Sequence, residues 1–279
     1  MASPPAPPVR RITSPKNPAL GLVRQLQHKR ERRERRLLVV EGEDLLDAAL
    51  AHGVRPTLVL VDSDRVPDDD PILLRLADLD ERYSVPGALL AKVSTLAAPP
   101  RVIAVLPQSG PHHFRTVTFP PSLALYLAGV ADPGNVGTLL RTAAALGCDW
   151  LALGPGSADA ANPKAVRAAM GATFAIPILE GVTPADLATR EGFTVVAAVA
   201  RGGVPPWECD LVSPTVLALG AERAGLGPVL GELAAARPVV LLTIPQAEGA
   251  ESLNVAAAGA AILAEALRQR RTATPQSVT

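Results

Sequence analysis

The feature that most constrains the fold is a repeated alternation of continuous apolar runs with segments of helical periodicity. In the second half of the chain, strands are expected at 123–130, 149–154, 193–200, 215–220 and 238–244. Helices are expected at 136–146, 163–171, 184–190, 228–236 and 252–270. Uninterrupted apolar runs such as Val195–Ala200 and Val239–Thr243 are typical of a parallel sheet with helices on both faces. The pattern therefore predicts an α/β fold.

The first half of the chain shows the same alternation on a smaller scale. A helix is expected from about 18 to 36, with Asn17 as its cap and Pro18 at its first position. Strands are expected at 37–40, 57–61, 84–86 and 102–106, and helices at 43–52 and 71–82. The chain then divides into a basic N-terminal arm and helix (1–36), a small α/β domain (37–107), a linker (108–122), a second α/β domain (123–271) and a tail (272–279).

The net charge of zero conceals a polarised chain. Residues 1–36 carry ten basic and two acidic side chains, a net charge of +8, whereas residues 37–279 carry a net charge of −8. Such asymmetry favours a polyanionic partner. The alternative is a solvated helix whose charges pair internally, as Glu31 and Arg35 can at i,i+4. The basic side chains that we expect to contact a nucleic acid are Arg10, Arg11, Lys16, Lys29, Arg30 and Arg33.

Several classes of protein are disfavoured by what the sequence lacks. No run approaches the roughly 18 apolar residues of a membrane helix, and no signal-peptide pattern is seen. Because Cys148 and Cys209 are the only cysteines, we expect no disulfide framework and a cytoplasmic location. The second domain has no histidine, which excludes a histidine triad there, and no zinc-site spacing occurs. Aromatic residues, at 3%, are too few for a sheet that stacks several bases.

Polar loops that contain glycine follow three of the expected strands in the second domain. They span Asp132–Arg141, Gly220–Gly227 and Ile244–Val255. Because ligands bind outside the carboxyl ends of strands in open parallel sheets, these loops are the expected site. Each has a plain alternative when taken singly. Asn135 and Ser252 are each placed to cap a helix, Arg141 suits a solvated surface, and Asn254 would lie in the first turn of the last helix.

Together and in this order, the loops resemble the three motifs of the SpoU (TrmH-type) branch of the SPOUT methyltransferases. The motif Asn-x-Gly-x-x-x-Arg is met by Asn135, Gly137 and Arg141. The motif Gly-x-Glu-x-x-Gly after an apolar strand is met by Gly220, Glu222 and Gly225. The motif Ile-Pro followed by Ser-Leu-Asn is met by Ile244, Pro245, Ser252, Leu253 and Asn254. The chain departs from the family at Gln246, where Met is frequent, and at Ala256, where Ser is frequent.

The stretches 12–18 and 40–43 resemble the N-terminal extension of the family members that act on ribosomal RNA. That extension is a small α/β domain related to RNA-binding ribosomal proteins. The resemblance therefore implies a homodimeric enzyme that methylates a ribose 2′-hydroxyl of RNA, 23S ribosomal RNA foremost, with S-adenosylmethionine as cofactor. It also implies that the second domain contains a deep trefoil knot. No metal and no membrane partner are expected.

The resemblance also implies roles for single residues. Gly220, Ile244 and Leu253 would bind the cofactor, and the catalytic set would be Asn135, Arg141, Glu222, Ser252 and Asn254. Because arginine does not deprotonate in proteins, we expect Arg141 to bind the adjacent phosphate or the developing oxyanion, with Asn135 orienting it. Glu222, Ser252 and Asn254 would then position Arg141 and the ribose.

Two other functions stay open at this point. One is a transfer-RNA methyltransferase of the same fold, against which the separate small domain counts. The other is a non-catalytic RNA-binding protein that kept the fold, against which the three intact motifs count. Methylation that confers resistance to a ribosome-targeted antibiotic is a related possibility.

Overall fold

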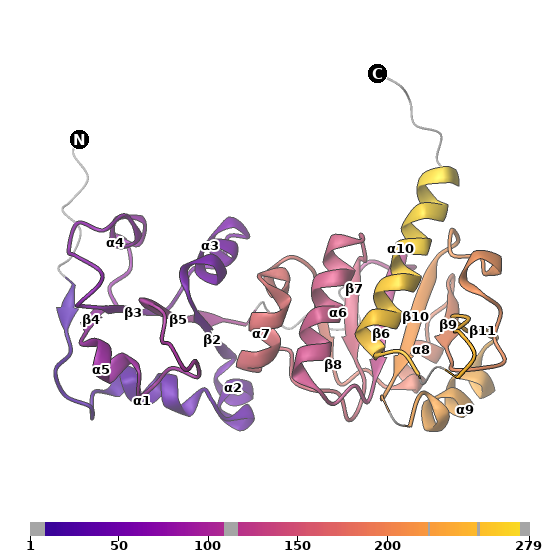
Figure 1. Ribbon diagram of the computed structural model, residues 1–279, viewed down its shortest axis with the longest axis horizontal. Helices are drawn as coiled ribbons and strands as arrows, with labels where there is room; N and C mark the ends of the chain where they lie inside the picture. Colours follow the sequence, from indigo (N-terminus) through magenta and orange to yellow (C-terminus); the bar gives the residue numbers. More distant parts are fainter. Residues whose placement is uncertain (1–8, 109–116, 223, 250–251, 274–279) are drawn as a thin grey trace, which may run out of the picture. The chain divides into compact units, whose positions relative to one another are not determined.

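The computed structural model describes residues 9–108, 117–222, 224–249 and 252–273 (Figure 1). The chain forms two compact units, one from Met1–Gly110 with Ala161–Phe174 and the other from Pro111–Ala160 with Ala175–Thr279. Most of the expected linker, 109–116, and most of the expected tail, 274–279, lie outside the described residues. Both units alternate strands and helices, so the predicted α/β class is confirmed.

The first unit is a five-stranded mixed sheet with helices on both faces. Its strands are β1 (Arg10–Arg11), β2 (Leu37–Glu41), β3 (Leu58–Asp62), β4 (Arg82–Val85) and β5 (Val102–Pro107), in the order β1-β4-β3-β5-β2. Its helices from the first half of the chain are α1 (Pro18–Gln25), α2 (Lys29–Arg35), α3 (Glu43–Ala51), α4 (Pro71–Arg75) and α5 (Gly87–Leu90). Because successive strand residues point to opposite faces of the sheet, they contribute to two separate cores. One core packs against α1 and α5, and the other against α3 and α4.

The expected basic arm belongs to this unit. Strand β1 pairs with β4, and Leu20 and Val23 of α1 are buried in one of the two cores. Asn17 accepts a hydrogen bond from the Ala19 amide and Pro18 is the first helical residue, so the predicted helix start is confirmed. The single helix expected from 18 to 36 is wrong, because the chain breaks between α1 and α2.

Arg32 gives the physical reason for that break. Its side chain is 1% exposed and donates hydrogen bonds to the Leu26 and Gln27 carbonyls, at 2.9 and 2.7 Å. A buried guanidinium therefore satisfies carbonyl groups that a continuous helix would have bonded internally. The expected helix 71–82 is also shorter, ending at Arg75. Buried Arg82 binds the Leu73 and Leu79 carbonyls where the chain turns into β4.

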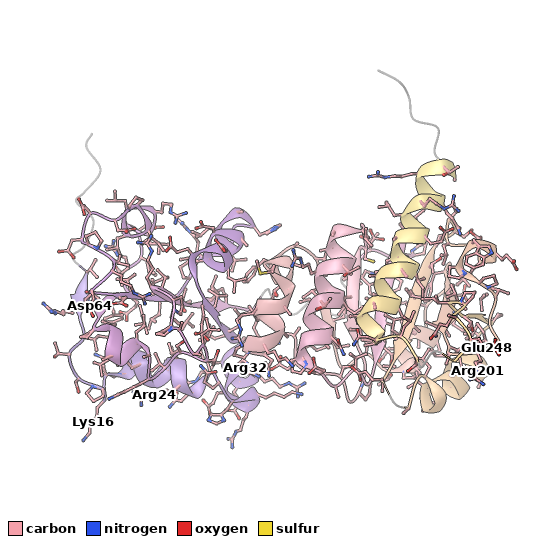
Figure 2. The ribbon with its side chains drawn as sticks, viewed as in Figure 1. Lys16, Arg24, Arg32, Asp64, Arg201 and Glu248 are labelled. Carbon is pink, nitrogen blue, oxygen red and sulfur yellow. The ribbon has the colours of Figure 1, made fainter. Side chains whose placement is uncertain are left out.

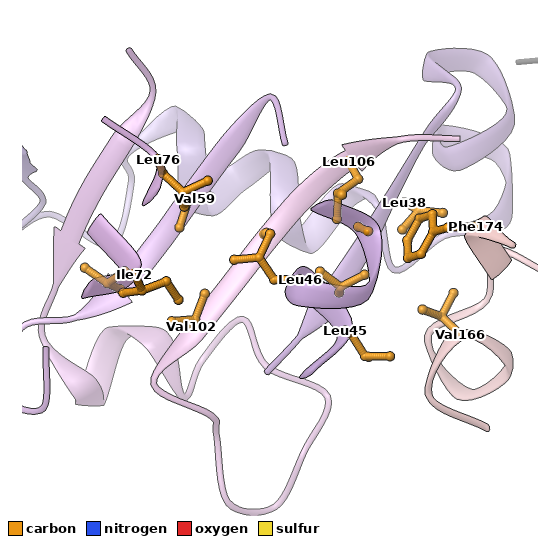
Figure 3. Packing of buried hydrophobic residues seen from close by; sticks show 14 of the residues in the cluster. Leu38, Leu45, Leu46, Val59, Ile72, Leu76, Val102, Leu106, Val166 and Phe174 are labelled. Carbon is orange, nitrogen blue, oxygen red and sulfur yellow. The ribbon is translucent and has the colours of Figure 1, made fainter. Parts of the chain in front are cut away.

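One segment from the second half of the chain packs in the first unit. Ala161–Phe174, which comprises α7 (Pro163–Ala169) and the 3-10 turn Ala172–Phe174, was expected in the second domain but clusters with the first unit. Figure 3 shows Val166 and Phe174 beside Leu38 of β2, in the core that also holds α3. The boundary between the two units is therefore set by burial of this apolar face and not by the order of the segments in the chain.

Two polar contacts hold the segment in place. Arg167 donates to Thr95 Oγ1 at 2.7 Å and lies 3.7 Å from a carboxylate oxygen of Glu41, whose side chain is 2% exposed. Gly171 has a φ of +90°, and a Cβ there would lie 2.5 Å from Cβ of Ala48, so only glycine fits against α3.

The second unit is a six-stranded parallel sheet, as the apolar runs predicted. Its strands are β6 (Leu123–Ala128), β7 (Trp150–Leu153), β8 (Ile178–Glu180), β9 (Thr194–Ala198), β10 (Thr215–Gly220) and β11 (Val239–Leu242), in the order β11-β9-β10-β6-β7-β8. Its helices are α6 (Pro133–Ala145), α8 (Pro184–Ala188), α9 (Gly227–Ala236) and α10 (Val255–Ala273), with a 3-10 turn at Pro206–Glu208. Strand β8 is the one strand of this sheet that the sequence did not indicate.

Helices α6 and α10 lie side by side, and α8 contacts α9 (Figure 1). A Cβ at Gly259 of α10 would lie 2.4 Å from Cδ2 of Leu139 in α6, so this glycine allows the two helices to approach closely. No helix among the described residues is long and apolar enough to cross a membrane.

Candidate functional site

The three polar loops meet at one edge of the parallel sheet. They follow β6, β10 and β11, and the carboxyl ends of parallel strands share an edge. The side-chain amide of Asn135 donates to Glu222 Oε1 at 2.7 Å, and Asn254 donates to Asn135 Oδ1 at 3.2 Å. Residues more than 80 positions apart thus form one hydrogen-bonded chain, which brings together one member of each sequence motif.

Asn135 is held more firmly than either neighbour. Its backbone amide donates to Asp132 Oδ1 at 3.0 Å in the first turn of α6, so Asp132, and not Asn135, caps this helix. Its side-chain oxygen and one of its two amide hydrogens bind Asn254 and Glu222. The second amide hydrogen has no acceptor among the described residues, which leaves one donor for a ligand.

Asn254 is the cap of α10, a role that the sequence favoured for Ser252. Its Oδ1 accepts from the Ala256 and Ala257 amides at 2.9 and 3.3 Å, and α10 begins at Val255. The expected position of Asn254 inside the first turn is therefore wrong. The capping geometry needs an extended residue directly before the helix, and the helix starts three residues later than expected.

A cavity opens beside this hydrogen-bonded chain. Its apolar wall includes Leu219, Leu242 and Ile262, and three expected cofactor residues line it: Gly220, Ile244 and Leu253. Glu222 and Ser252 line it as well. Leu253 is 45% exposed, so it presents an apolar surface that no part of its own unit covers.

Gly220 is required by the closeness of the backbone around it. A Cβ at this position would lie 2.2 Å from the Gly225 carbonyl carbon and 2.4 Å from the Leu226 nitrogen. Ala221 and Gly225 exchange backbone hydrogen bonds at 3.1 and 2.8 Å, and Gly225 has a φ of +59°. Glycine at this position permits close approach of the loop's own backbone, whereas the expected contact of Gly220 with the cofactor stays a prediction.

Arg141 stands apart from the other expected catalytic residues. It lies on α6, is exposed, and forms no hydrogen bond or ion pair with any residue that the structure describes. The expected contact with Asn135 is therefore not formed within the described chain. Its guanidinium keeps all its donors for a ligand.

The loop after β9 also contributes to the site, because Ala198–Ala200 line the cavity, and no motif in the sequence indicated it. The sequence feature that could have indicated this loop is Gly203, the second residue of a Gly-Gly pair. A Cβ there would lie 2.7 Å from the backbone of Leu241 and Leu242, and the Val204 amide bonds to the Leu241 carbonyl at 2.9 Å. Because Gly203 has no side chain, this loop can pack directly against the backbone of β11.

The cysteines offer no competing chemistry. Both are free and buried, and burial raises the pKa of Cys148 to about 12 and also raises the pKa of Cys209. A thiol that stays protonated is a poor nucleophile. No group of His, Cys, Asp and Glu side chains within the described ranges could hold a metal ion.

The six expected nucleic-acid contacts all lie in the first unit, and the structure separates them into two kinds. Arg10 pairs with Glu81 at 3.0 Å and Arg30 with Glu34 at 2.6 Å. The exposed side chains that form no ion pair with described residues are Arg11, Lys16, Lys29 and Arg33. The i,i+4 pair of Glu31 with Arg35, which the alternative reading predicted, is present at 3.1 Å.

The second unit has a parallel sheet with a cavity and a polar hydrogen-bonded chain at the carboxyl edge of its strands. This is the arrangement in which α/β enzymes bind their ligands. Residues 122–264 match the SpoU rRNA methylase family, and residues 17–104 match the MRM3-like substrate binding domain. The chain belongs to the SpoU rRNA methylase family. The RNA methyltransferase activity and the substrate-binding N-terminal domain expected from the motifs are thereby confirmed.

Relatives and solved structures extend over nearly the whole chain. A 23S rRNA (guanosine(2553)-2′-O)-methyltransferase of Bacillus subtilis is 33% identical over 93% of this chain and 100% of its own length. A 23S rRNA (uridine(2479)-2′-O)-methyltransferase of Streptomyces viridochromogenes is 31% identical over 96% of each chain. The crystal structure of an AdoMet-bound rRNA methyltransferase from Sinorhizobium meliloti superposes with a TM-score of 0.82, at 31% identity, over 94% of this chain and 98% of its own.

Proposed function

We propose that this chain transfers a methyl group from S-adenosylmethionine to a ribose 2′-hydroxyl of 23S ribosomal RNA. The observation that carries the proposal is the convergence of Asn135, Glu222 and Asn254 beside a cavity lined by Gly220 and Leu253. The relatives named above act on ribose hydroxyls of 23S rRNA, which supports this substrate over transfer RNA.

The cavity residues fit this cofactor. The loop that Gly220 closes supplies backbone groups for polar contacts, and Ile244, Leu253 and Leu242 supply apolar surface for an adenine ring. When bound, S-adenosylmethionine supplies an electrophilic methyl group. The chain's own residues must then orient the ribose and lower the energy of its oxyanion.

Arg141 suits the second task because it stays protonated. Its guanidinium, which has no partner among the described residues, can bind the phosphate next to the target ribose or the developing oxyanion, so that the hydroxyl proton passes to solvent more readily. Asn135 suits the first task, because both its side-chain oxygen and one of its amide hydrogens are already bound, which fixes the direction of the other hydrogen. Glu222, Asn254 and Ser252 position Asn135 and the ribose.

We further propose a cytoplasmic homodimer with a trefoil knot. Ala257, Ala261 and Ala264 are exposed along α10 at i, i+4 and i+7, which supports close approach of a second copy. The Val199 and Thr243 amides bond to the Leu242 and Val204 carbonyls. These bonds between the loop after β9 and the end of β11 support the entanglement that a knot requires. Analytical ultracentrifugation of the full chain tests the dimer.

Mapping of 2′-O-methyl groups in ribosomal RNA by mass spectrometry, with and without the gene, tests the function. One ribose should lose its methyl group in the deletion strain and regain it with the wild-type gene. Arg141→Ala should not restore it, while calorimetry should find cofactor binding unchanged. Identical methylation maps in the two strains would reject the proposed substrate, and full activity of Arg141→Ala would reject the role of that residue.

A further inference from the structure

A second cavity lies within the first unit, between α1 and β4, and has a volume of about 490 Å³. We call it the α1–β4 groove, and its lining includes Asn17, Gly21, Gln25, Arg35, Glu81 and Tyr83. Its size is within the range of sites that take a small organic ligand. The lining combines one aromatic ring with amide, carboxylate and guanidinium groups.

Tyr83 is the aromatic surface of this groove. The other tyrosine, Tyr126, is fully buried in the second unit, whereas Tyr83 is half-buried. The Tyr83 hydroxyl donates to Glu81, and the side chain packs against the core that contains α1. The Arg10 guanidinium lies 6.0 Å from the ring centroid and 3.0 Å from Glu81. The hydrogen bond of the hydroxyl and the cation over the ring therefore hold Tyr83 in one orientation.

Gly21 is a glycine inside a helix with no steric reason to be one. Its φ is not left-handed, and a Cβ at this position would meet nothing within 4 Å. A glycine inside a helix destabilises the helix relative to alanine. What Gly21 does provide is open space, because it lines the groove and carries no side chain.

Cations flank the groove. Arg35 is 45% exposed and lies between Glu31 at 3.1 Å and Gln25 at 3.2 Å. Lys16 lies two residues before the first residue of α1, and Arg24 of its last turn donates back to the Pro15 carbonyl at 2.6 Å; both side chains are exposed (Figure 2). A nucleic-acid strand that enters the groove therefore meets positive charge at both ends of α1.

We propose that the α1–β4 groove binds one unpaired nucleotide of the RNA substrate. The base takes the place of the Arg10 guanidinium on the Tyr83 ring, its amino edge donates to Glu81, and its phosphate contacts Arg35. The inference rests on the proposed function, since it places part of that enzyme's RNA substrate. A single stacked base is consistent with the low aromatic content, because one ring holds one base.

The test compares Gly21→Gln with Gly231→Gln in the full-length chain. Gln is a better helix former than Gly, so the first change fills the groove without weakening α1. Gly231 of α9 also has open space around it, so it gives the matched control. Fluorescence anisotropy then measures binding of a short single-stranded oligoribonucleotide and of a blunt duplex with the same sequence.

Gly21→Gln should bind the single strand roughly tenfold more weakly and with a shallower salt dependence, because the phosphate contact with Arg35 is lost, and it should bind the duplex like wild type. Tyr83→Leu should weaken single-strand binding by about the same factor, because a lost stacked base has this effect. Gly231→Gln should change nothing. The proposal is overturned if Gly21→Gln and Tyr83→Leu bind the single strand like wild type, or if both lose duplex binding equally.

Methylation of ribosomal RNA, measured on the same variants, separates this inference from the proposed function. If wild type methylates and Gly21→Gln binds and methylates equally well, the groove assignment fails and the function stands. If wild type methylates no ribose but Gly21→Gln still loses single-strand binding, the function fails and the groove assignment stands.

Discussion

Asn254 performs two tasks that substitution can separate. Its Oδ1 caps the 19-residue helix α10 through the Ala256 and Ala257 amides, and its Nδ2 donates to Asn135. Asn254→Ala removes both tasks. Asn254→Asp keeps the acceptor, which is favourable at a helix N-terminus, but has no amide hydrogen for Asn135.

The two substitutions should therefore differ in stability and agree in activity. Loss of the cap in Asn254→Ala should lower the free energy of unfolding by about 1 kcal/mol, which corresponds to a shift in Tm of roughly 2–4 °C. Asn254→Asp should stay within about 0.5 kcal/mol of wild type, because both amides keep an oxygen acceptor. Both should lower methyl transfer, because Asn135 loses the bond that fixes its oxygen, and Asp also places a second carboxylate near Glu222.

Urea denaturation measures the stability of each variant, and transfer of a labelled methyl group to ribosomal RNA measures activity at saturating cofactor. Equal destabilisation by the two substitutions would show that the cap does not account for the effect of Asn254. Wild-type activity of a stably folded Asn254→Asp would show that the hydrogen bond to Asn135 has no part in catalysis.

Three further predictions follow from single residues. Gly220→Ala should reduce cofactor affinity at least tenfold by calorimetry, because its Cβ would lie 2.2–2.4 Å from the facing backbone; Gly231→Ala, which has space, should bind normally. Arg32→Met should lower the free energy of unfolding by about 2–3 kcal/mol in urea melts, since the buried Leu26 carbonyl and the partly buried Gln27 carbonyl lose their donor, whereas exposed Arg33→Met should cost under about 0.5 kcal/mol. The bonds from Arg268 and Gln269 lower the pKa of Glu265 from 4.5 to about 2, so its contribution to stability is complete above pH 4.5 and is lost as the pH falls toward 2. Melts of Glu265→Gln across this range should lack that acid-sensitive part; an unchanged pH profile would contradict the assignment.

Local patterns predicted most of the elements, because the spacing of apolar residues along the chain follows the spacing of buried positions in helices and strands. The run Val239–Thr243 predicted a strand near the observed β11, and Asn17 with Pro18 marked the start of α1. The motif spacing also identified Asn135, Glu222 and Asn254 as members of one site. Local sequence could not show that Arg32 would turn inward and break a helix, since that depends on carbonyls brought close only by folding.

The sequence by itself therefore determined the α/β class, the parallel sheet of the second unit and the family. Apolar periodicity and motif order are properties of the linear chain. Only the tertiary structure decided that Ala161–Phe174 packs in the first unit, that Asn254 caps α10 while bonding to Asn135, and that Arg141 remains unpaired among the described residues. It also decided that Gly21, Tyr83 and Glu81 line one groove. These contacts join residues far apart in the chain, so they arise from burial and packing that no local pattern encodes.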